Sequence, residues 1–235
     1  MVSAKKRSRV GSRNSSIPFR GWILISSCLA LLFLSPIVSS LLHSLKTPRD
    51  SSQSPPTYLP KTLSFDNYKS LANSSSGIIS NGIFVYIQNS LILALITVIG
   101  TLILATLAGY GFAQFKFKGK EIYFSAILLM IMVPFQALLT PLYFLFSQVG
   151  IQNSLFGLGL IYITYQLPFS IFLMRNTFMV IPKALSEAAL VDGCSSFKVF
   201  KSIMLPLAQP GIISVSLFAF FASWNEFIAA LTMIS

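Results

Sequence analysis

The sequence predicts an all-α polytopic membrane protein, a bundle of transmembrane helices. Of its 235 residues, 54% are hydrophobic and only 10% carry a charged side chain, whereas about 25% of the residues of a soluble domain are charged. The mean hydropathy is +0.75. The apolar residues gather in runs long enough for helices of about 20 residues, the length that crosses the hydrocarbon core of a bilayer. Much of the surface is therefore expected to face lipid.

Composition also narrows the function classes. A net charge of +11 is typical of nucleic-acid-binding proteins, but here the positive residues lie in short segments between apolar runs, as in the cytoplasmic loops of membrane proteins. We therefore expect membrane lipid, and no nucleic acid, among the partners. The chain has one histidine and six acidic residues, and no Ser/His/Asp set or carboxylate pair is evident. The sequence predicts no catalytic residue and no metal site.

The amino-terminal segment predicts the first span. Residues 1–20 form a basic arm with six Lys and Arg residues and no acid, and residues 21–45 contain no Lys, Arg, Asp or Glu. A basic arm before an apolar run is also typical of a signal peptide, but the apolar region of such a peptide has about 7–15 residues. Because this run is longer and further spans follow, we expect an uncleaved helix.

Four more spans are expected after a hydrophilic segment at residues 46–82, which is rich in Ser, Pro and Asn. Each is apolar over a length that fits the bilayer core, and only Glu226 brings an acidic side chain into one of them. The expected spans are residues 89–112, 122–144, 155–174 and 211–233.

The distribution of positive residues predicts the topology. Thirteen of the 17 Lys and Arg residues lie in segments 1–20, 116–120 and 175–210, and the other four lie in segment 46–82. Segment 145–154 has none. Five alternating spans place the three rich segments on one side, which the positive-inside rule identifies as the cytoplasm. The amino terminus is therefore expected in the cytoplasm.

The predicted cytoplasmic segment 175–210 contains EAALVDGCSSFKVFKSIMLP, a polar stretch between apolar runs. Pro182 suits the first turn of a helix, and the good helix formers that follow extend it to about Asp192. Gly193 comes where a helix commonly ends in the left-handed conformation. Ser195 or Ser196 can cap a second helix. The pattern predicts a tight helical hairpin.

The second helix of this hairpin is predicted to be amphipathic. Phe197, Phe200 and Met204 share one face at helical spacing, and Lys198 and Lys201 share another. A basic amphipathic loop of this kind can rest on lipid headgroups. Two short helices with small residues at their turn could also dock in a groove of another protein. Composition alone leaves both interpretations open.

The spacing within the hairpin resembles the signature loop of permease subunits of ABC importers. In that signature, Glu-Ala-Ala is followed after three residues by Gly, and after nine more by Ile-x-Leu-Pro. A chance match to these identities anywhere in the chain is on the order of one in a million, at about 7% for each residue. The matching residues are Glu187, Ala188, Ala189, Gly193, Ile203, Leu205 and Pro206.

Further stretches resemble one branch of that family, the carbohydrate importers, and within it the second permease subunit of maltose-type systems. The resemblance covers residues 20–235 and is specific for the family but weakly specific for the sugar. The stretches are TLSFDNYKSL (62–71), NSLILALITVIGTLILATLAGYGFAQFKFKGK (89–120), VPFQALLTPLYFL (133–145) and WNEF (224–227).

The resemblance implies a membrane permease domain at residues 21–235, with a coupling loop at about 175–210 that docks on a separate ATPase. ATP and Mg would bind two copies of that ATPase, so that no cofactor belongs to this chain. The implied assembly adds a second, homologous permease subunit and an extracytoplasmic solute-binding protein. Its location would be a bacterial plasma (inner) membrane. The implied activity is translocation of a sugar or sugar derivative by ATP-driven alternating access.

Residue roles follow from the same resemblance. The docking turn would be formed by Glu187, Ala188, Ala189, Asp192 and Gly193, and the two carboxylates would pair with basic groups of the ATPase. The residues implied to anchor the second helix are Ile203, Leu205 and Pro206.

The substrate pathway is predicted from polar residues inside the spans. Glu226 is the one acid well inside a span, and such residues are commonly functional because their burial in lipid is costly. It is expected either to line the pathway beside Asn225 or to reach toward the outer interface. Gln136 and Tyr165 are further polar groups that face a sugar or hold helices together.

The sequence lacks the parts that a self-sufficient ATP-driven transporter needs. Its one Gly-Lys pair, Gly119-Lys120, is followed by Glu121 rather than by the Ser or Thr of a phosphate-binding loop. Gly109 and Gly111 lie inside an expected span, where small residues indicate close helix packing. ATP hydrolysis is therefore expected in a partner.

One departure from the family pattern keeps alternatives open. Six spans are expected for such permeases, and this sequence contains about five. A truncated, non-transporting permease fragment is one alternative. A stand-alone secondary transporter is another, although Glu226 alone gives it little support. A membrane-embedded enzyme would need clustered acids, which are not evident.

Overall fold

The computed structural model describes residues 19–54, 57–72 and 82–234, and within these ranges every regular element is a helix. This confirms the all-α prediction. Most of the basic arm expected at residues 1–20 lies outside the described residues. The chain divides into two compact units, Met1–Ile83 and Phe84–Ser235, which are described separately.

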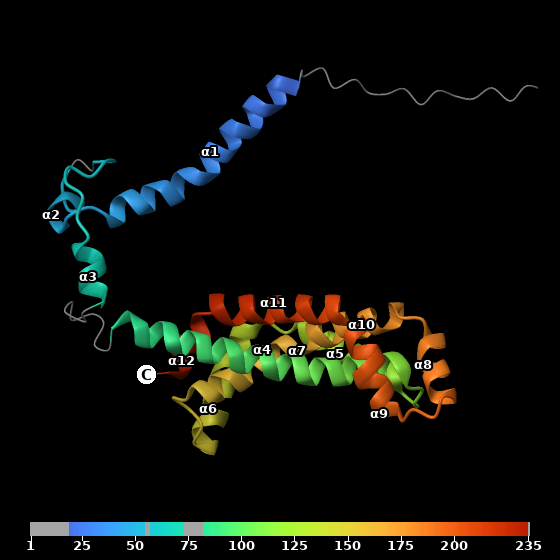
Figure 1. Ribbon diagram of the computed structural model, residues 1–235. Helices are drawn as coiled ribbons and strands as arrows, with labels where there is room; N and C mark the ends of the chain where they lie inside the picture. Colours follow the sequence, from blue (N-terminus) through green and yellow to red (C-terminus); the bar gives the residue numbers. More distant parts are fainter. Residues whose placement is uncertain (1–18, 55–56, 73–81, 235) are drawn as a thin grey trace, which may run out of the picture. The chain divides into compact units, whose positions relative to one another are not determined.

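The first unit contains one long apolar helix and a short folded segment. Helix α1 (Phe19–Ser44) confirms the first expected span, and its stretch Gly21–Ser44 buries none of its residues. It is followed by α2 (Pro48–Ser51) and α3 (Asp66–Ala72) (Figure 1). The hydrophilic segment 46–82 is thus partly helical, and its residues 73–81 lie outside the described residues.

The second unit is built on two long helices, α4 (Ile83–Gln114) and α7 (Leu155–Val180). They confirm the spans expected at residues 89–112 and 155–174, and both extend further. The expectation that a loop opens at Arg175 is wrong.

Helix α7 continues past Arg175 because its buried face continues: the side chains of Met174 and Phe178 are 0% exposed. It ends where Ile181 turns extended, with φ −72° and ψ 125°. Pro182 explains this conformation, since a proline disfavours the helical region for the residue before it.

The third expected span, residues 122–144, is not one helix. Helix α5 (Lys120–Leu129) continues into the 3₁₀ turn η1 (Met130–Met132), and α6 (Phe135–Val149) leaves at an angle of 99°. The break lies at Val133, which is extended at φ −77° and ψ 121° because Pro134 follows it.

The fifth expected span, residues 211–233, is also interrupted. Helix α11 (Gln209–Asn225) ends at Glu226, whose backbone is extended at φ −78° and ψ 125°, and α12 (Ile228–Met233) begins two residues later. Among the described residues, three unbroken helices are long and apolar enough to span a membrane. Up to five spans are present if each of two bent helix pairs counts as one, namely Lys120–Met132 with Phe135–Val149 and Ser196–Leu207 with Gln209–Asn225. The residues expected to form the third and fifth spans are thus each divided between two helices.

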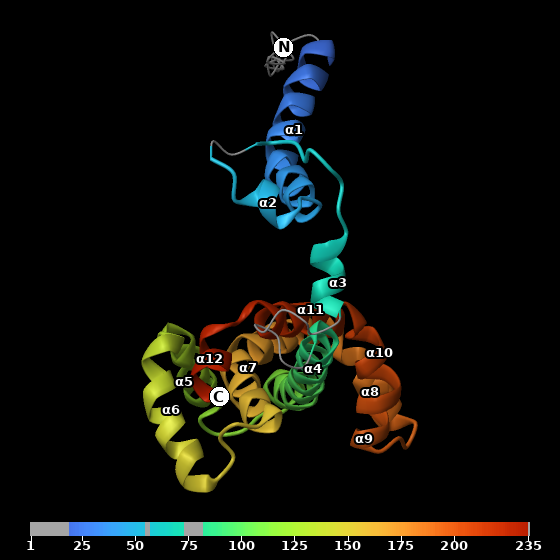
Figure 2. The same cartoon turned by 90° about the vertical axis from the view of Figure 1, so that its left-hand side faces the viewer.

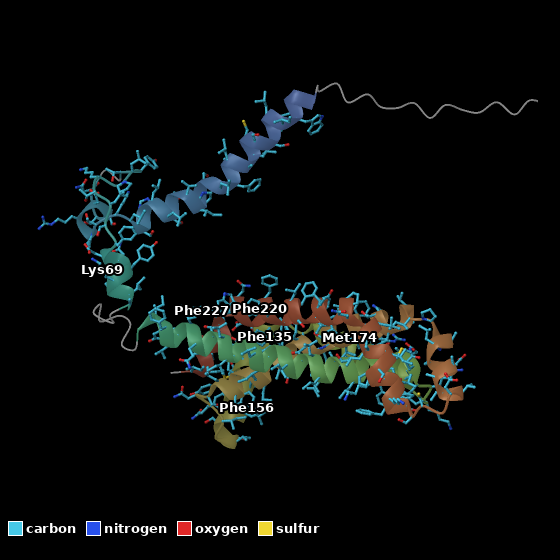
Figure 3. The ribbon with its side chains drawn as sticks, viewed as in Figure 1. Lys69, Phe135, Phe156, Met174, Phe220 and Phe227 are labelled. Carbon is cyan, nitrogen blue, oxygen red and sulfur yellow. The ribbon has the colours of Figure 1, made fainter. Side chains whose placement is uncertain are left out.

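Two clusters of buried side chains hold the second unit together, and α7 contributes to both. One contains Met174 and the other contains Phe135, both labelled in Figure 3. The Met174 cluster joins α4, α7 and α11 to the short helices after α7, whereas the Phe135 cluster joins α7 to α6 and α12. Figure 2 shows α6 and α8 on opposite sides of the unit.

The predicted close packing of small residues in α4 is confirmed at one of two glycines. A Cβ atom added to Gly109 would lie 2.5 Å from Cβ of Met174 and 2.9 Å from the backbone nitrogen of Arg175. At Gly111 it would have no heavy atom within 4 Å. Only Gly109 therefore lets α4 approach the backbone of α7.

We predict that Gly109→Ala lowers the free energy of unfolding of the purified protein by about 1–3 kcal/mol, because the added methyl group forces two helix backbones apart. The melting temperature should fall accordingly. Gly111→Ala is the matched control. It should be neutral or stabilising by up to about 1 kcal/mol, the helix-propensity gain of alanine over glycine. Equal melting temperatures for the two variants would contradict the close packing at Gly109.

Candidate functional site

The signature loop folds into the expected hairpin. Helix α8 (Lys183–Val191) has Asp192 as its C-cap, and the φ of the following Gly193 is +83°. The amide of Gly193 donates to the carbonyl of Leu190 at 3.1 Å, and the amide of Cys194 donates to the carbonyl of Ala189 at 3.0 Å. These two bonds form a Schellman motif, which satisfies the last carbonyls of a helix. A left-handed residue is required at this turn, and glycine adopts that conformation without steric cost.

The docking residues predicted from sequence lie together around this turn, on two sides of α8. Glu187, Ala188, Asp192 and Gly193 are exposed. Ala189 is instead buried, at 7% exposure, and belongs to the Met174 cluster. The first helix of the hairpin therefore presents two carboxylates and a small side chain outward while one alanine packs it against the protein.

The second helix of the hairpin is irregular. Ser195 caps it, accepting a hydrogen bond from the amide of Lys198 at 3.3 Å. Helix α9 (Ser196–Val199) then passes into a π-helical turn, η2 (Phe200–Met204), and into α10 (Leu205–Leu207). Figure 1 shows this segment beside α8.

The π-helical turn changes which side chains face inward. Phe200 and Met204 pack against the Met174 cluster, but Phe197, expected on the same face, is 71% exposed. A π-helical turn contains one more residue than an α-helical turn, so the turn η2 shifts the register between Phe197 and Met204. The predicted common face is therefore wrong for Phe197.

The three predicted anchor residues differ in burial. Ile203 packs against the Met174 cluster, Leu205 is partly buried, and Pro206 is exposed. The most deeply buried positions of this segment are others, at 0–2% exposure: Val199, Met204 and Ala208.

An aromatic cluster connects the hairpin to the two long helices. The ring of Phe200 lies 4.8 Å from that of Tyr110 in α4 and 6.5 Å from that of Phe178 in α7, measured between ring centroids. Tyr110 and Phe178 stand edge to face at 5.3 Å. A displacement of the hairpin would therefore press on α4 and α7 together, since packed rings resist separate movement.

The hairpin also exposes apolar side chains, and two of them, Leu190 and Val191, are absent from the predicted site residues. Val191 is 87% exposed and Leu190 is 49% exposed, both next to the docking turn, and Phe197 lies just beyond it. Exposed apolar side chains rimmed by charges are typical of protein-binding surfaces. Leu190 and Val191 lie in the last turn of α8, and the sequence of so short a helix does not show which of its faces is covered.

A salt bridge lies at the same end of α7. Nη2 of Arg175 is 2.8 Å from Oε1 and 3.0 Å from Oε2 of Glu121 in the first turn of α5. The guanidinium carbon also lies 3.9 Å from the ring centroid of Phe124. The pair links α5 to α7. Arg175, which was expected in a loop, therefore helps to hold two helices together.

A separate pocket of about 260 Å³ lies between α6, α7 and the α11–α12 break. It brings together three of the four predicted pathway residues, Tyr165, Asn225 and Glu226, whereas Gln136 is exposed on α6 and does not line it. The complete lining is Phe135, Tyr162, Tyr165, Phe221, Ala222, Asn225 and Glu226.

Glu226 links α7 to the start of α12 through hydrogen bonds of its carboxylate. Its Oε2 accepts a hydrogen bond from the hydroxyl of Tyr162 at 2.7 Å and one from the amide of Ala229 at 2.9 Å. The carboxylate thus caps the first turn of α12, where the positive end of the helix dipole favours a negative group. Glu226 thus lines this pocket, and its role in a substrate pathway stays a prediction.

Among the described residues, no group of three or more His, Cys, Asp and Glu side chains is arranged to hold a metal ion.

Comparison with known proteins gives a consistent result. Residues 102–235 match the family described as binding-protein-dependent transport system inner membrane component. The arabinooligosaccharides transport system permease protein AraQ of Bacillus subtilis is 36% identical over 205 residues, 85% of this chain and 69% of AraQ. The trehalose transport system permease protein SugB of Mycobacterium tuberculosis is 30% identical over 212 residues, 90% of this chain and 74% of SugB.

A solved structure has the same fold. It is a bacterial ABC transporter involved in the import of the acidic polysaccharide alginate, and the match has a TM-score of 0.74 at 21% sequence identity. The alignment covers 97% of this chain and 78% of the matched chain.

We predict that Tyr162 and Glu226 are energetically coupled. Tyr162→Phe and Glu226→Ala should each destabilise the protein, and the double variant should lose less than the sum, with a coupling energy of about 1 kcal/mol. Thermal unfolding of the four proteins of this cycle measures the coupling. Additive losses would contradict the hydrogen bond as the link between α7 and the α11–α12 break.

Proposed function

The chain belongs to the binding-protein-dependent transport system inner membrane component family, and we propose that it is one permease subunit of an ABC importer that carries a sugar or sugar derivative. The observation that carries this proposal is the hairpin at α8–α10. Its turn at Gly193 exposes Glu187, Ala188 and Asp192. The opposite side of the hairpin packs into the Met174 cluster of the second unit. A surface of this kind suits a subunit that a separate protein binds.

The orientation follows from charge. With the amino terminus in the cytoplasm of a bacterial cell, the hairpin also lies on the cytoplasmic side of the inner membrane, as the excess of Lys and Arg in segments 1–20, 116–120 and 175–210 supports. This is the side on which ATP is available. The basic residues and the docking surface would then share one compartment with the ATPase.

In this proposal, other chains bind and hydrolyse the ATP that drives transport. Two copies of a separate ATPase bind ATP and Mg, a second homologous permease completes the pathway, and an extracytoplasmic protein delivers the solute. When the ATPase copies close, the docked hairpin moves with them. Because Phe200 packs against Tyr110 and Phe178, that movement reaches α4 and α7 and switches access from one side to the other.

The chemistry of the pocket at the α11–α12 break suits a saccharide. Tyr165 and Phe221 supply aromatic faces, and the Asn225 amide and the Glu226 carboxylate supply hydrogen-bonding groups. Pockets for small molecules commonly combine apolar walls with a few such polar groups. The names of the relatives AraQ and SugB, which refer to arabinooligosaccharides and trehalose, support a sugar in general rather than one sugar.

The coupling role predicts the effect of reversing one charge. In proteoliposomes that contain the whole transporter, Glu187→Lys should lower ATP-dependent sugar uptake roughly tenfold or more, a loss of about 1.4 kcal/mol of docking energy. Membrane insertion and melting temperature should not change, because Glu187 is exposed. Glu187→Asp, which keeps the carboxylate, is the matched control.

Normal uptake by Glu187→Lys would overturn the docking assignment. Uptake that persists when the ATPase is omitted would overturn the importer itself and favour a secondary transporter.

The pocket predicts a change in apparent affinity. Tyr165→Ala should raise the KM for the transported sugar roughly fivefold, since it removes an aromatic contact of about 1 kcal/mol. Gln136→Ala, a change outside the pocket, should leave the KM unchanged. Initial uptake rates over a range of sugar concentrations test both variants, and equal KM values would refute sugar contact by Tyr165.

A further inference from the structure

The segment after α1 is folded back onto the end of that helix. The amide of Ser64 donates to the carbonyl of Leu45 at 2.9 Å. The side-chain amide of Asn67 donates to the carbonyls of Ser44 and Lys46, both at 2.9 Å. Ser64 and Asn67 are thereby tied to the end of α1 and to the two residues that follow it. We call the described part of segment 46–69 the foot.

Two buried charged side chains fix the foot internally. Asp50 is 5% exposed and accepts a hydrogen bond from the amide of Lys61 at 2.9 Å. Lys46 is 1% exposed and its ammonium group donates to the carbonyl of Thr57. Buried charges are costly unless they are hydrogen-bonded, so these contacts favour one conformation of the foot.

The length of α1 sets the depth of the foot. The apolar stretch Gly21–Ser44 has 24 residues, which is about 36 Å of helix, and a bilayer core is about 30 Å thick. The last turn of α1 therefore lies at the boundary between acyl chains and headgroups. Since the foot is hydrogen-bonded to that turn, it lies at the same level.

Aromatic side chains of the foot lie beside the last turns of α1. The Tyr68 hydroxyl lies 2.7 Å from Oγ of Ser44, and the Tyr68 side chain lines a shallow groove along α1 with Ile37 and Leu41. The ring of Phe65 lies 6.3 Å from that of Tyr68 and its side chain is 62% exposed. In the same unit, Ile37 and Leu41 are each 58% exposed, so the groove continues the surface of α1 that is available to lipid.

We propose that the foot is an interfacial anchor whose Phe65 and Tyr68 side chains bind the headgroup–acyl boundary of the lipid bilayer and fix the depth of α1. Amphipathic aromatic side chains are enriched at this level of membrane proteins. A lipid occupant is favoured over a protein because Tyr68 packs along the apolar face of the helix rather than pointing away from its end. Further exposed apolar side chains of the foot are Tyr58, Leu59 and Leu63. Figure 3 shows the side chains of this unit, with Lys69 labelled.

Bromolipid quenching tests this proposal. The full chain carries two tryptophans, which are replaced by Trp22→Phe and Trp224→Phe, and Phe65→Trp is then introduced. The protein is reconstituted in nanodiscs of phosphatidylcholine that is brominated near the headgroup end of the acyl chain, or in unbrominated lipid. The proposal predicts loss of most of the fluorescence in bromolipid, blue-shifted emission and little quenching by aqueous acrylamide.

A second variant tests the hydrogen bonds that set the depth. Asn67→Ala, added to the Phe65→Trp protein, should reduce bromolipid quenching because it frees the foot from α1. Gln53→Ala, a change at an exposed position of the foot, is the matched control and should keep the quenching. Emission that is unquenched by bromolipid and quenched by acrylamide would overturn lipid binding and favour a protein-docking surface. Unchanged quenching in Asn67→Ala would refute the contacts with α1 as the cause of the depth.

Discussion

The close packing of α7 against its neighbours is the interaction on which the second unit depends. Its amino-terminal half supplies Tyr162 to the cluster around Phe135, and its carboxyl-terminal half supplies Met174 and Phe178 to the other cluster. Such packing requires close approach, and Gly109 gives α4 access to the α7 backbone. Helix association in a membrane relies on such contacts, because lipid tails are as apolar as the side chains and supply no hydrophobic driving force. The proposed pocket and hairpin are both built on this helix.

Two of the interruptions in the helices of the second unit lie at the pocket and at the hairpin, and in both a side chain or a turn satisfies backbone groups. At the α11–α12 break the Glu226 carboxylate accepts from the Ala229 amide, and at the hairpin the Schellman turn at Gly193 satisfies the end of α8. Unsatisfied backbone groups are costly in a membrane, so irregular backbone there is tolerated where protein surrounds it or where it lines a cavity. At the α11–α12 break the Glu226 carboxylate meets this constraint and also lines the pocket.

Much of this fold could be predicted from the sequence, because apolar runs specify helices and Gly193 specifies a turn through its own conformational freedom. The breaks at Pro134 and Glu226 could not, since a proline or an acid in an apolar run is compatible with a continuous helix. The partner of Glu226, Tyr162, lies 64 residues away, and the partner of Arg175, Glu121, lies 54 residues away. Contacts at such separations leave no periodic signal. The register shift that exposes Phe197 comes from the π-helical turn η2, which the spacing of apolar residues does not predict.

We propose that this chain works as one subunit of a larger transport complex and is driven through its hairpin by a separate ATPase. Purification of the tagged chain from native membranes under mild detergent, with mass spectrometry of the proteins that accompany it, tests this most directly. The expected result is recovery of an ATPase and a second permease in fixed proportion to the chain, and the identity of these proteins would narrow the class of sugar. Recovery of the chain alone from membranes that contain these proteins would contradict it.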